Sequence, residues 1–297
     1  MIRKPEDGQW TMFIRSVFRR IKRQIFFISI SLANWIAIHH LGIEAIQFVC
    51  NICGKCCQVV YSSMSREQIS CFSCGSSVRY RSVIHTLLVG LGLENRTLKH
   101  IEDKKSIIGI GMTDSGVYTK LLSKKFSYTN TFYHREPKLD ILKIEGQELG
   151  CAHFIICSDV FEHVSTPISL AFQNLFRLLK HGGMLVLTVP IVDHAQAKEY
   201  FPTLNKYHVE YRGSTPVLIN MTVSGQREIF YALTFHEGEG QTLVMRDFSK
   251  EWVFDELLKA GFTEIRLMDE EYPDFGIVWG RELSVPILAW KPMQAEG

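Results

Sequence analysis

The sequence predicts an α/β fold, in which a mostly parallel sheet is covered by helices on both faces, preceded by a small cysteine-rich module. Three observations predict it. A strand, a glycine-containing turn and a helix follow one another over residues 106–122. Two continuous apolar runs, 153–157 and 184–190, flank a helical stretch, and six of the eight cysteines fall within 50–74. Alternating strands and helices imply parallel strands that are buried on both faces.

Length and composition limit the possible classes of protein. The 297 residues are enough for one full α/β domain with one or two small additions. With 46% apolar and 22% charged residues, the chain can bury a core and is not disordered by composition. The formal net charge is only +2, whereas dedicated nucleic-acid binders are usually more basic. We identify no cleavable signal peptide and expect a cytoplasmic protein.

Residues 1–45 are predicted to form a helical extension. Apolar residues recur at helical spacing from Trp10 to Trp35, and seven basic residues stand among residues 1–24. The opposite side of the helix carries basic residues: Arg15, Arg19, Lys22 and Arg23. Such a helix fits an anionic membrane surface, here the inner one. A helix packed on the protein's own core is an open alternative. A spanning helix is disfavoured, because polar residues dilute the apolar stretch and the rest of the chain would cross the membrane.

Residues 46–80 are predicted to form a zinc-binding module. Two C-x-x-C pairs, each followed by glycine and separated by seventeen residues, are formed by Cys50, Cys53, Cys71 and Cys74. Without export, such a cluster indicates a metal site, and four thiolates suit tetrahedral zinc. An alternative register pairs Cys53 with Cys56. Four cysteines leave no open position on the ion, so the zinc is expected to be structural. Arg79 and Arg81 follow closely and are either solvated or hold an anionic group.

Residues 81–297 are predicted to form the main domain. Its expected elements, in chain order, are a strand at 106–110, a helix at 117–122, strands at 126–132 and 153–157, a helix at 167–179 capped by 181–183, a strand at 184–190, a helix at 252–262, and strands at 264–268 and 286–291. An insertion at about 191–248 separates the fifth strand from the last helix. We expect this insertion to build a lid over the substrate.

The run from Ile155 to Pro190 carries a resemblance to a known family. "IICSDVFEHV", followed by "LFRLLKHGGMLVLTVP", resembles the central block of class I S-adenosylmethionine-dependent methyltransferases. In that family a strand ends in a D-x-x-E-H-V-like turn, and "GIGMTDSG" is similar to the family's cofactor loop. The resemblance covers roughly 105–292, and "CFSCGSSVRYR" resembles the zinc ribbon that precedes this domain in a bacterial subgroup. It implies a Rossmann-like domain with S-adenosylmethionine as cofactor.

The resemblance also implies a set of site residues. The implied cofactor contacts are Gly109, Gly111, Thr113, Asp114, Asn130, Asp140, Ile141 and Asp159. Gly109 and Asn130 stand where the family usually has acidic residues, whereas Asp140 and Ile141 match its adenine contact. Candidate bases near the strand ends are Asp159, Glu162, His163 and His194. His163 is alternatively a hydrogen-bonded residue that shapes its turn.

The expected reaction is in-line methyl transfer, for which the protein supplies alignment and removes water. The expected acceptor is a small molecule, a glycan or a lipid-linked precursor. One alternative is an rRNA or tRNA methyltransferase, although residues beyond 45 show no dense basic stripe with interleaved aromatic residues. Another alternative is a non-catalytic adaptor that keeps the fold.

Overall fold

The computed structural model describes residues 7–193, 196–236, 242–280, 282 and 284–294. Within the first helix it describes side chains only for residues 18, 21–22 and 24–39. The N-terminal elements are α1 (Asp7–His39), β1 (Ala45–Val49), β2 (Cys56–Val60), the 3-10 helix η1 (Tyr61–Ser63) and α2 (Val78–Gly90).

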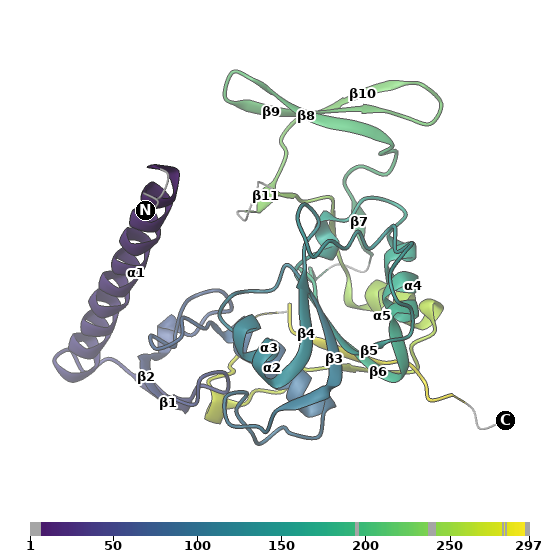
Figure 1. Ribbon diagram of the computed structural model, residues 1–297. Helices are drawn as coiled ribbons and strands as arrows, with labels where there is room; N and C mark the ends of the chain where they lie inside the picture. The colour runs from purple at the N-terminus through teal and green to yellow at the C-terminus, as the bar shows by residue number, and fades with distance from the viewer. Residues whose placement is uncertain (1–6, 194–195, 237–241, 281, 283, 295–297) are drawn as a thin grey trace, which may run out of the picture.

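The main domain is built on a six-stranded sheet with the order β14-β15-β6-β5-β3-β4 (Figure 1). Its strands are β3 (Lys104–Met112), β4 (Phe126–Thr131), β5 (Ala152–Ser158), β6 (Leu179–Thr188), β14 (Glu264–Leu267) and β15 (Ile287–Trp290). Strands β4, β3, β5 and β6 are parallel, and β15 is antiparallel to both of its neighbours. The predicted mostly parallel sheet and its two final antiparallel strands are therefore confirmed.

Helices cover both faces of this sheet (Figure 1). They are α3 (Thr119–Lys125), α4 (Ile168–Leu178) and α5 (Lys250–Ala260), together with α2. Along β5, Phe154 and Ile156 pack toward α2 and α3, whereas Ile155 and Cys157 pack toward α4 and α5. Successive side chains of a strand point to opposite faces, so a strand buried on both sides is apolar throughout. The doubly wound prediction is thus confirmed.

The ends of the last helix follow from local sequence. The Ser249 side chain accepts a hydrogen bond from the Trp252 amide at the start of α5. Gly261 ends the helix with a φ of 108°, in the left-handed region that glycine tolerates. At α4, by contrast, the predicted glycine cap is wrong, because β6 begins at Leu179 and includes residues 181–183. Gly182 and Gly183 instead exchange backbone hydrogen bonds with Lys291 beyond β15.

The cysteine module shares a core with the main domain. Strands β1 and β2 form an antiparallel hairpin, and Phe48 and Ile52 pack in one cluster with Ile84 and Leu87 of α2. The expected boundary after residue 80 therefore falls inside α2, which belongs to both parts.

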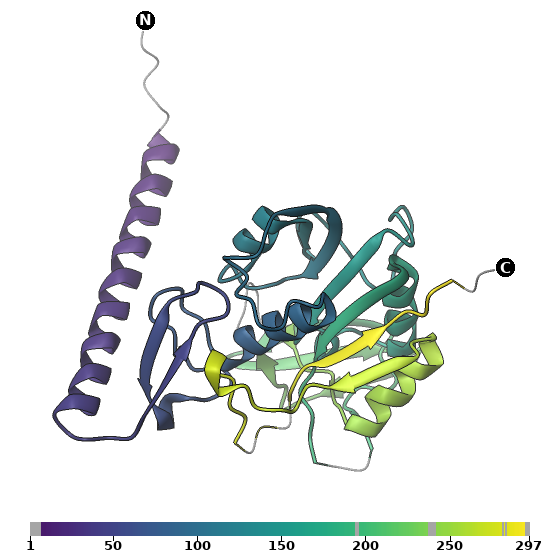
Figure 2. The ribbon, with the colours of Figure 1, turned by 90° about the horizontal axis from the view of Figure 1, so that it is seen from below.

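Helix α1 projects from the body and packs on β2 near its C-terminal end (Figures 1 and 2). There the Asn34 side chain binds the Gln58 carbonyl and the Val60 amide. Eight large apolar side chains are each at least 41% exposed: Phe18, Ile21, Ile25, Phe26, Ile28, Leu32, Trp35 and Ile36. This exposure does not agree with a helix packed on the core. The predicted basic side chains other than Lys22 lie outside the described side chains. Among the described residues, no helix has an apolar stretch sufficient to cross a membrane.

The insertion divides into two parts. Strands β8 (Lys206–Arg212), β9 (Thr215–Met221) and β10 (Arg227–Phe230) form an antiparallel sheet that stands off from the body (Figure 1). Four short strands form two pairs nearer the main sheet: β7 (Lys198–Glu199) with β13 (Arg246–Asp247), and β11 (Phe235–His236) with β12 (Thr242–Leu243). The remaining elements are the 3-10 helices η2 (Phe161–His163) and η3 (Pro273–Phe275).

Candidate functional site

The strand order of the sheet reverses between the carboxyl ends of β3 and β5. The chain passes from β3 outward to β4 on one side, and from β5 outward to β6 on the other. In open α/β sheets, ligands bind where the strand order reverses in this way. Thr113 and Asp159, directly after β3 and β5, have φ values of 57° and 52°. Non-glycine residues in this left-handed region are uncommon and concentrate at functional sites. We therefore build the candidate site from this edge.

The loop after β3 is held by a buried carboxyl group. Asp114 accepts hydrogen bonds from the hydroxyl groups of Tyr118, at 2.8 Å, and Tyr128, at 2.5 Å. Burial raises the pKa of Asp114 to about 7, although both hydrogen bonds and the charge of Arg79 act in the opposite direction. Asn130, at the end of β4, accepts from the Asp114 amide and donates to its carbonyl. Asp114 and Asn130 therefore shape the loop in this structure.

The glycines of the loop differ in what they face. A Cβ atom on Gly109 would lie 2.1 Å from the Phe154 ring, and one on Gly111 would lie 1.9 Å from the Tyr128 hydroxyl. These two glycines make room for the protein's own side chains. Gly116 is exposed, and a Cβ there would meet no atom within 4 Å. Open space for a ligand thus lies beside the second half of the loop.

Asp140 and Ile141 lie in the segment after β4. Asp140 is half-buried, and one of its carboxylate oxygens accepts from the Leu142 amide at 3.0 Å. Ile141 is buried, and its carbonyl accepts from the Asn174 side chain of α4. The half-buried carboxylate of Asp140 and the open backbone at Gly116 are groups that fit a nucleoside cofactor, whereas Gly109 and Gly111 do not add to that fit.

Asp159 binds two arginines of the N-terminal part. Arg66 donates to both of its carboxylate oxygens, at 2.8 and 2.9 Å, and Arg79 lies 3.1 Å from one of them. The Thr188 hydroxyl, at the end of β6, adds a third donor at 2.8 Å. Burial alone would raise the pKa of Asp159, but the charges of Arg66 and Arg79 and the hydrogen bonds from Arg66 and Thr188 hold it below its usual value. A carboxylate so stabilised is a weak proton acceptor, which argues against Asp159 as the base.

Glu162, His163 and His236 form a second group beside the end of β5. The carboxylate of Glu162 lies 3.7 Å from Nε2 of His163 and 3.7 Å from Nδ1 of His236. Nδ1 of His163 lies 2.9 Å from the Leu243 carbonyl in β12, which it binds. This hydrogen bond joins the turn after β5 to β12 of the insertion. The other candidate base of the insertion, His194, lies outside the described residues.

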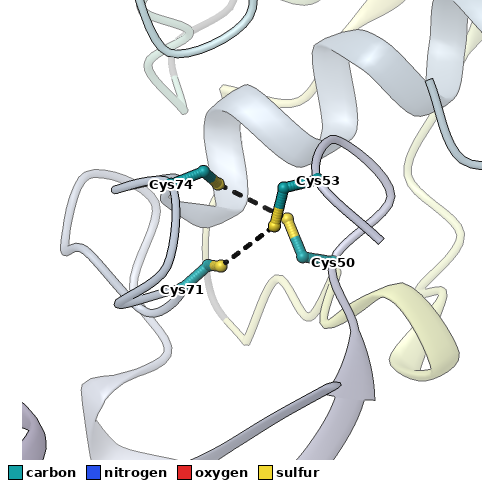
Figure 3. A group of neighbouring side chains, drawn as sticks. All are labelled: Cys50, Cys53, Cys71 and Cys74. Carbon is teal, nitrogen blue, oxygen red and sulfur yellow. Dashed lines mark hydrogen bonds between the residues drawn. The ribbon is translucent and has the colours of Figure 1, made fainter. Parts of the chain in front are cut away.

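The four cysteines of the two C-x-x-C pairs point toward one another (Figure 3). The sulfurs of Cys50 and Cys74 lie 3.7 Å apart, as do those of Cys53 and Cys71, and all four lie within 4.8 Å of one another. Four thiolates about 2.3 Å from one tetrahedral zinc ion would lie about 3.8 Å apart, so the arrangement fits zinc. Cys56 is exposed and does not belong to this group, which favours the register through Cys50.

Arg81 is neither solvated nor open to an anionic ligand. It is fully buried and donates to the carbonyls of Ser76 and Gly276 and to the Ser70 hydroxyl. Its guanidinium also lies over the Phe48 ring. Zinc with four thiolates carries a net charge of −2, so a buried cation beside the cysteines offsets it. Arg81 thereby joins the cysteine module to the segment that follows β14.

Two site residues had no signal in the sequence. Arg66 binds a carboxylate 93 positions away, and the fully buried Arg246 donates to the carbonyls of Phe161 and Val164, more than 80 positions away. Arg246 also pairs with Glu199, so it fixes η2 from the side of the insertion. Only the tertiary fold brings such partners together.

No family model matches this chain, and no curated protein matches it in sequence. Several solved structures match it weakly. An S-adenosylmethionine-dependent methyltransferase from Clostridium acetobutylicum is 11% identical, with a TM-score of 0.40 over 75% of this chain and 95% of its own. An amino pentose methyltransferase from Micromonospora echinaspora is 11% identical, with a TM-score of 0.41 over 73% and 92%. The 1,6-didemethyltoxoflavin-N1-methyltransferase of Burkholderia thailandensis is 11% identical, with a TM-score of 0.39 over 72% and 78%. Matches at these levels carry no argument about what this chain does.

Proposed function

We propose that this chain is an S-adenosylmethionine-dependent methyltransferase that acts on a small molecule, a glycan or a lipid-linked precursor. The observation that carries the proposal is the reversal of strand order between β3 and β5, directly after which Thr113 and Asp159 adopt left-handed conformations. The resemblance of residues 155–190 to the methyltransferase family supports the same site.

The protein's own residues would bind and orient the reactants. When bound, S-adenosylmethionine supplies the electrophilic methyl carbon. The open backbone around Gly116 and the carboxylate of Asp140 are the groups available to hold it. Asp159, fixed by Arg66, acts as a positioning residue for the turn after β5. The Met245 amide, between β12 and β13, donates to the Glu162 carbonyl, so this part of the insertion lies against that turn. It would exclude water from the turn.

We also propose that Cys50, Cys53, Cys71 and Cys74 hold one structural zinc ion. The distances between their sulfurs support it, as do the turns after each pair. Gly54 and Gly75 have φ values of 71° and 84°, and each donates its amide to the carbonyl of the first cysteine in its pair. With all four positions taken, the ion would stabilise the module and its contact with α2.

Helix α1 supports a proposed contact with the surface of an anionic membrane. Its exposed apolar side chains and the basic residues of its N-terminal half are the two components that such binding needs. Sedimentation with vesicles would test this contact. We expect the chain to bind vesicles containing phosphatidylserine, and Ile25→Glu with Phe26→Glu to abolish binding. Equal recovery of both proteins with the vesicles would contradict it.

Isothermal titration with S-adenosylmethionine and S-adenosylhomocysteine tests the proposed activity. We expect saturable micromolar binding by the zinc-loaded protein and at least about tenfold weaker binding by Asp140→Ala, since a buried hydrogen bond to a ligand contributes about 1.4 kcal/mol or more. Asp255→Ala, at an exposed position of α5, is the matched control and should bind normally. Absence of binding by folded protein would reject the enzyme and favour the adaptor alternative.

A further inference from the structure

A buried carboxylate without a hydrogen-bond partner among the described residues lies in η2, just after β5. Glu162 is 0% exposed, and neither of its carboxylate oxygens has a hydrogen-bond partner among the described residues. An isolated charge in such a place is costly, so buried carboxylates are normally paired or coordinate metals. The backbone carbonyl of Glu162 does have a hydrogen-bond partner, because it accepts from the Met245 amide. The side chain therefore requires an explanation that the rest of the fold does not supply.

Two imidazole nitrogens face this carboxylate. Nε2 of His163 and Nδ1 of His236 each lie 3.7 Å from the same oxygen, Oε1, and the three atoms lie within 4.8 Å of one another. A separation of 3.7 Å is too long for a hydrogen bond. Ligand atoms about 2.0–2.2 Å from one tetrahedral metal ion lie about 3.4 Å apart, so a shift of about 0.3 Å would bring these donors to the spacing that an ion requires.

The hydrogen bond of His163 selects the nitrogen that faces the group. A carbonyl oxygen can only accept, so Nδ1 of His163 carries the proton that binds Leu243. In the neutral ring, Nε2 then presents its lone pair toward Glu162. Metal-binding histidines commonly donate their other ring N–H to a backbone carbonyl, which fixes the tautomer and the ring orientation.

The insertion supplies two parts of this arrangement at once. Strands β11 and β12 pair with each other, with Phe235 opposite Leu243 and His236 opposite Thr242. The same hairpin therefore carries a nitrogen donor, on His236, and the carbonyl that orients His163. Arg246, fully buried, holds the carbonyls on either side of Glu162. The backbone beside Glu162 and the ring of His163 are thus held by contacts from the insertion, which contributes to preorganising the site.

We propose that Glu162, His163 and His236, hereafter the Glu–His–His cluster, bind one divalent first-row transition-metal ion. Two imidazoles and one carboxylate suit zinc, iron, cobalt or manganese better than magnesium or calcium, which prefer all-oxygen ligands. Three protein ligands leave at least one position open to water or to an oxygen of a ligand. The side chain of His236 is 47% exposed, so an ion can reach the cluster from solvent. His163 acts here as a ligand instead of a general base.

Cobalt(II) titration of the full zinc-loaded chain tests the cluster, because cobalt bound by nitrogen and oxygen lacks the intense thiolate charge-transfer absorption of a cysteine site. We expect one further equivalent of cobalt to bind with weak visible bands and no thiolate absorption. His236→Ala should weaken this binding at least about 100-fold, since even the outer partners of metal ligands contribute 10–100-fold. Glu162→Gln, which keeps the shape of the side chain, should do the same.

His208→Ala is the matched control, because His208 is exposed on β8 and belongs to no such group. It should bind cobalt as the unaltered chain does. If Glu162 and His236 form an ion pair only, no cobalt will bind to the zinc-loaded chain, and the proposal is rejected. Binding that is unchanged in His236→Ala would also reject it, and that variant is at an exposed position, where folding is not at risk. The titration contains no S-adenosylmethionine, so its failure would leave the proposed methyl transfer untouched.

Discussion

Arg66 of the cysteine module makes two hydrogen bonds to Asp159, the residue that follows the central strand β5. The side chains of the two residues are 12% and 17% exposed, so the pair is largely shielded from water. Arg79, at the start of α2, completes the contact. The module is therefore joined to the candidate site by charge as well as by the shared apolar core. Changes at the four cysteines and at the carboxyl end of β5 should consequently affect one another.

The Arg66–Asp159 contact can be measured by a double-mutant cycle. We expect Arg66→Ala to lower the free energy of unfolding by about 2–3 kcal/mol, because it leaves a buried carboxylate with fewer donors. In an Asp159→Asn background, Arg66→Ala should lower the free energy of unfolding by a smaller amount. The difference between the two values, the coupling energy, should be about 1 kcal/mol or more. Urea unfolding of the four proteins provides the values.

Arg212→Ala is the control for that cycle. Arg212 pairs with Glu210 on β8, where the two side chains are 48% and 39% exposed. Exposed pairs contribute about 0–1 kcal/mol, so this change should be nearly neutral. A cost for Arg66→Ala no larger than that for Arg212→Ala would show that the contact to Asp159 does not form.

Zinc content distinguishes the two cysteine registers. We expect about one zinc per chain, with Cys50→Ser losing the ion and Cys56→Ser retaining it, because a structural site needs all four ligands and only these two cysteines differ between the registers. Metal analysis after gel filtration is the measurement, and Cys56 is a fair control because it is exposed. Loss of zinc in Cys56→Ser with retention in Cys50→Ser would contradict the arrangement in Figure 3.

Glycine substitutions separate packing from ligand contact. Gly109→Ala should destabilise the protein by about 1–3 kcal/mol, because the added Cβ would overlap the Phe154 ring. Gly116→Ala should leave the melting temperature almost unchanged, since its Cβ enters open space, but should weaken binding of S-adenosylhomocysteine. Thermal melting and titration of both variants provide the comparison. Normal cofactor binding by Gly116→Ala would exclude close approach of the ligand at that loop.

The buried Asp114 should make stability depend on pH. Burial raises its pKa in the folded protein to about 7, above the ordinary 3.8, so the folded state keeps the proton at pH values where the unfolded state has released it. The stability that this group contributes is therefore present at low pH and lost as pH rises from about 4 to about 7, by at most about 4 kcal/mol.

Asp114→Asn removes this titration while keeping an acceptor for the two tyrosines. The difference in unfolding free energy between the unaltered chain and the variant should change steadily over that interval, in favour of the variant as pH rises. A constant difference between pH 4.5 and 7.5 would mean that Asp114 titrates normally.

The sequence predicted the strands and the cysteine group, which depend on residues close together in the chain. Continuous apolar runs indicated β5 and β6, and the spacing of C-x-x-C pairs predicted which sulfurs lie together, because both signals lie within a few residues. It did not predict the partners of Asp159 or the role of Arg81, because those contacts join residues 93 and 195 positions apart. Gly109 and Gly111 were assigned to a ligand by their position in the loop, yet their neighbours are Phe154 and Tyr128 from other strands.

A crystal structure of the zinc-loaded protein with S-adenosylhomocysteine would test the central claim most directly. We predict ligand density between the carboxyl ends of β3 and β5, beside Gly116 and within hydrogen-bond distance of Asp140. Such density would establish the edge between β3 and β5 as a cofactor site and justify a search for the methyl acceptor. Ligand density elsewhere on the molecule, or no ligand density at this edge in crystals grown with saturating ligand, would contradict the proposed cofactor site.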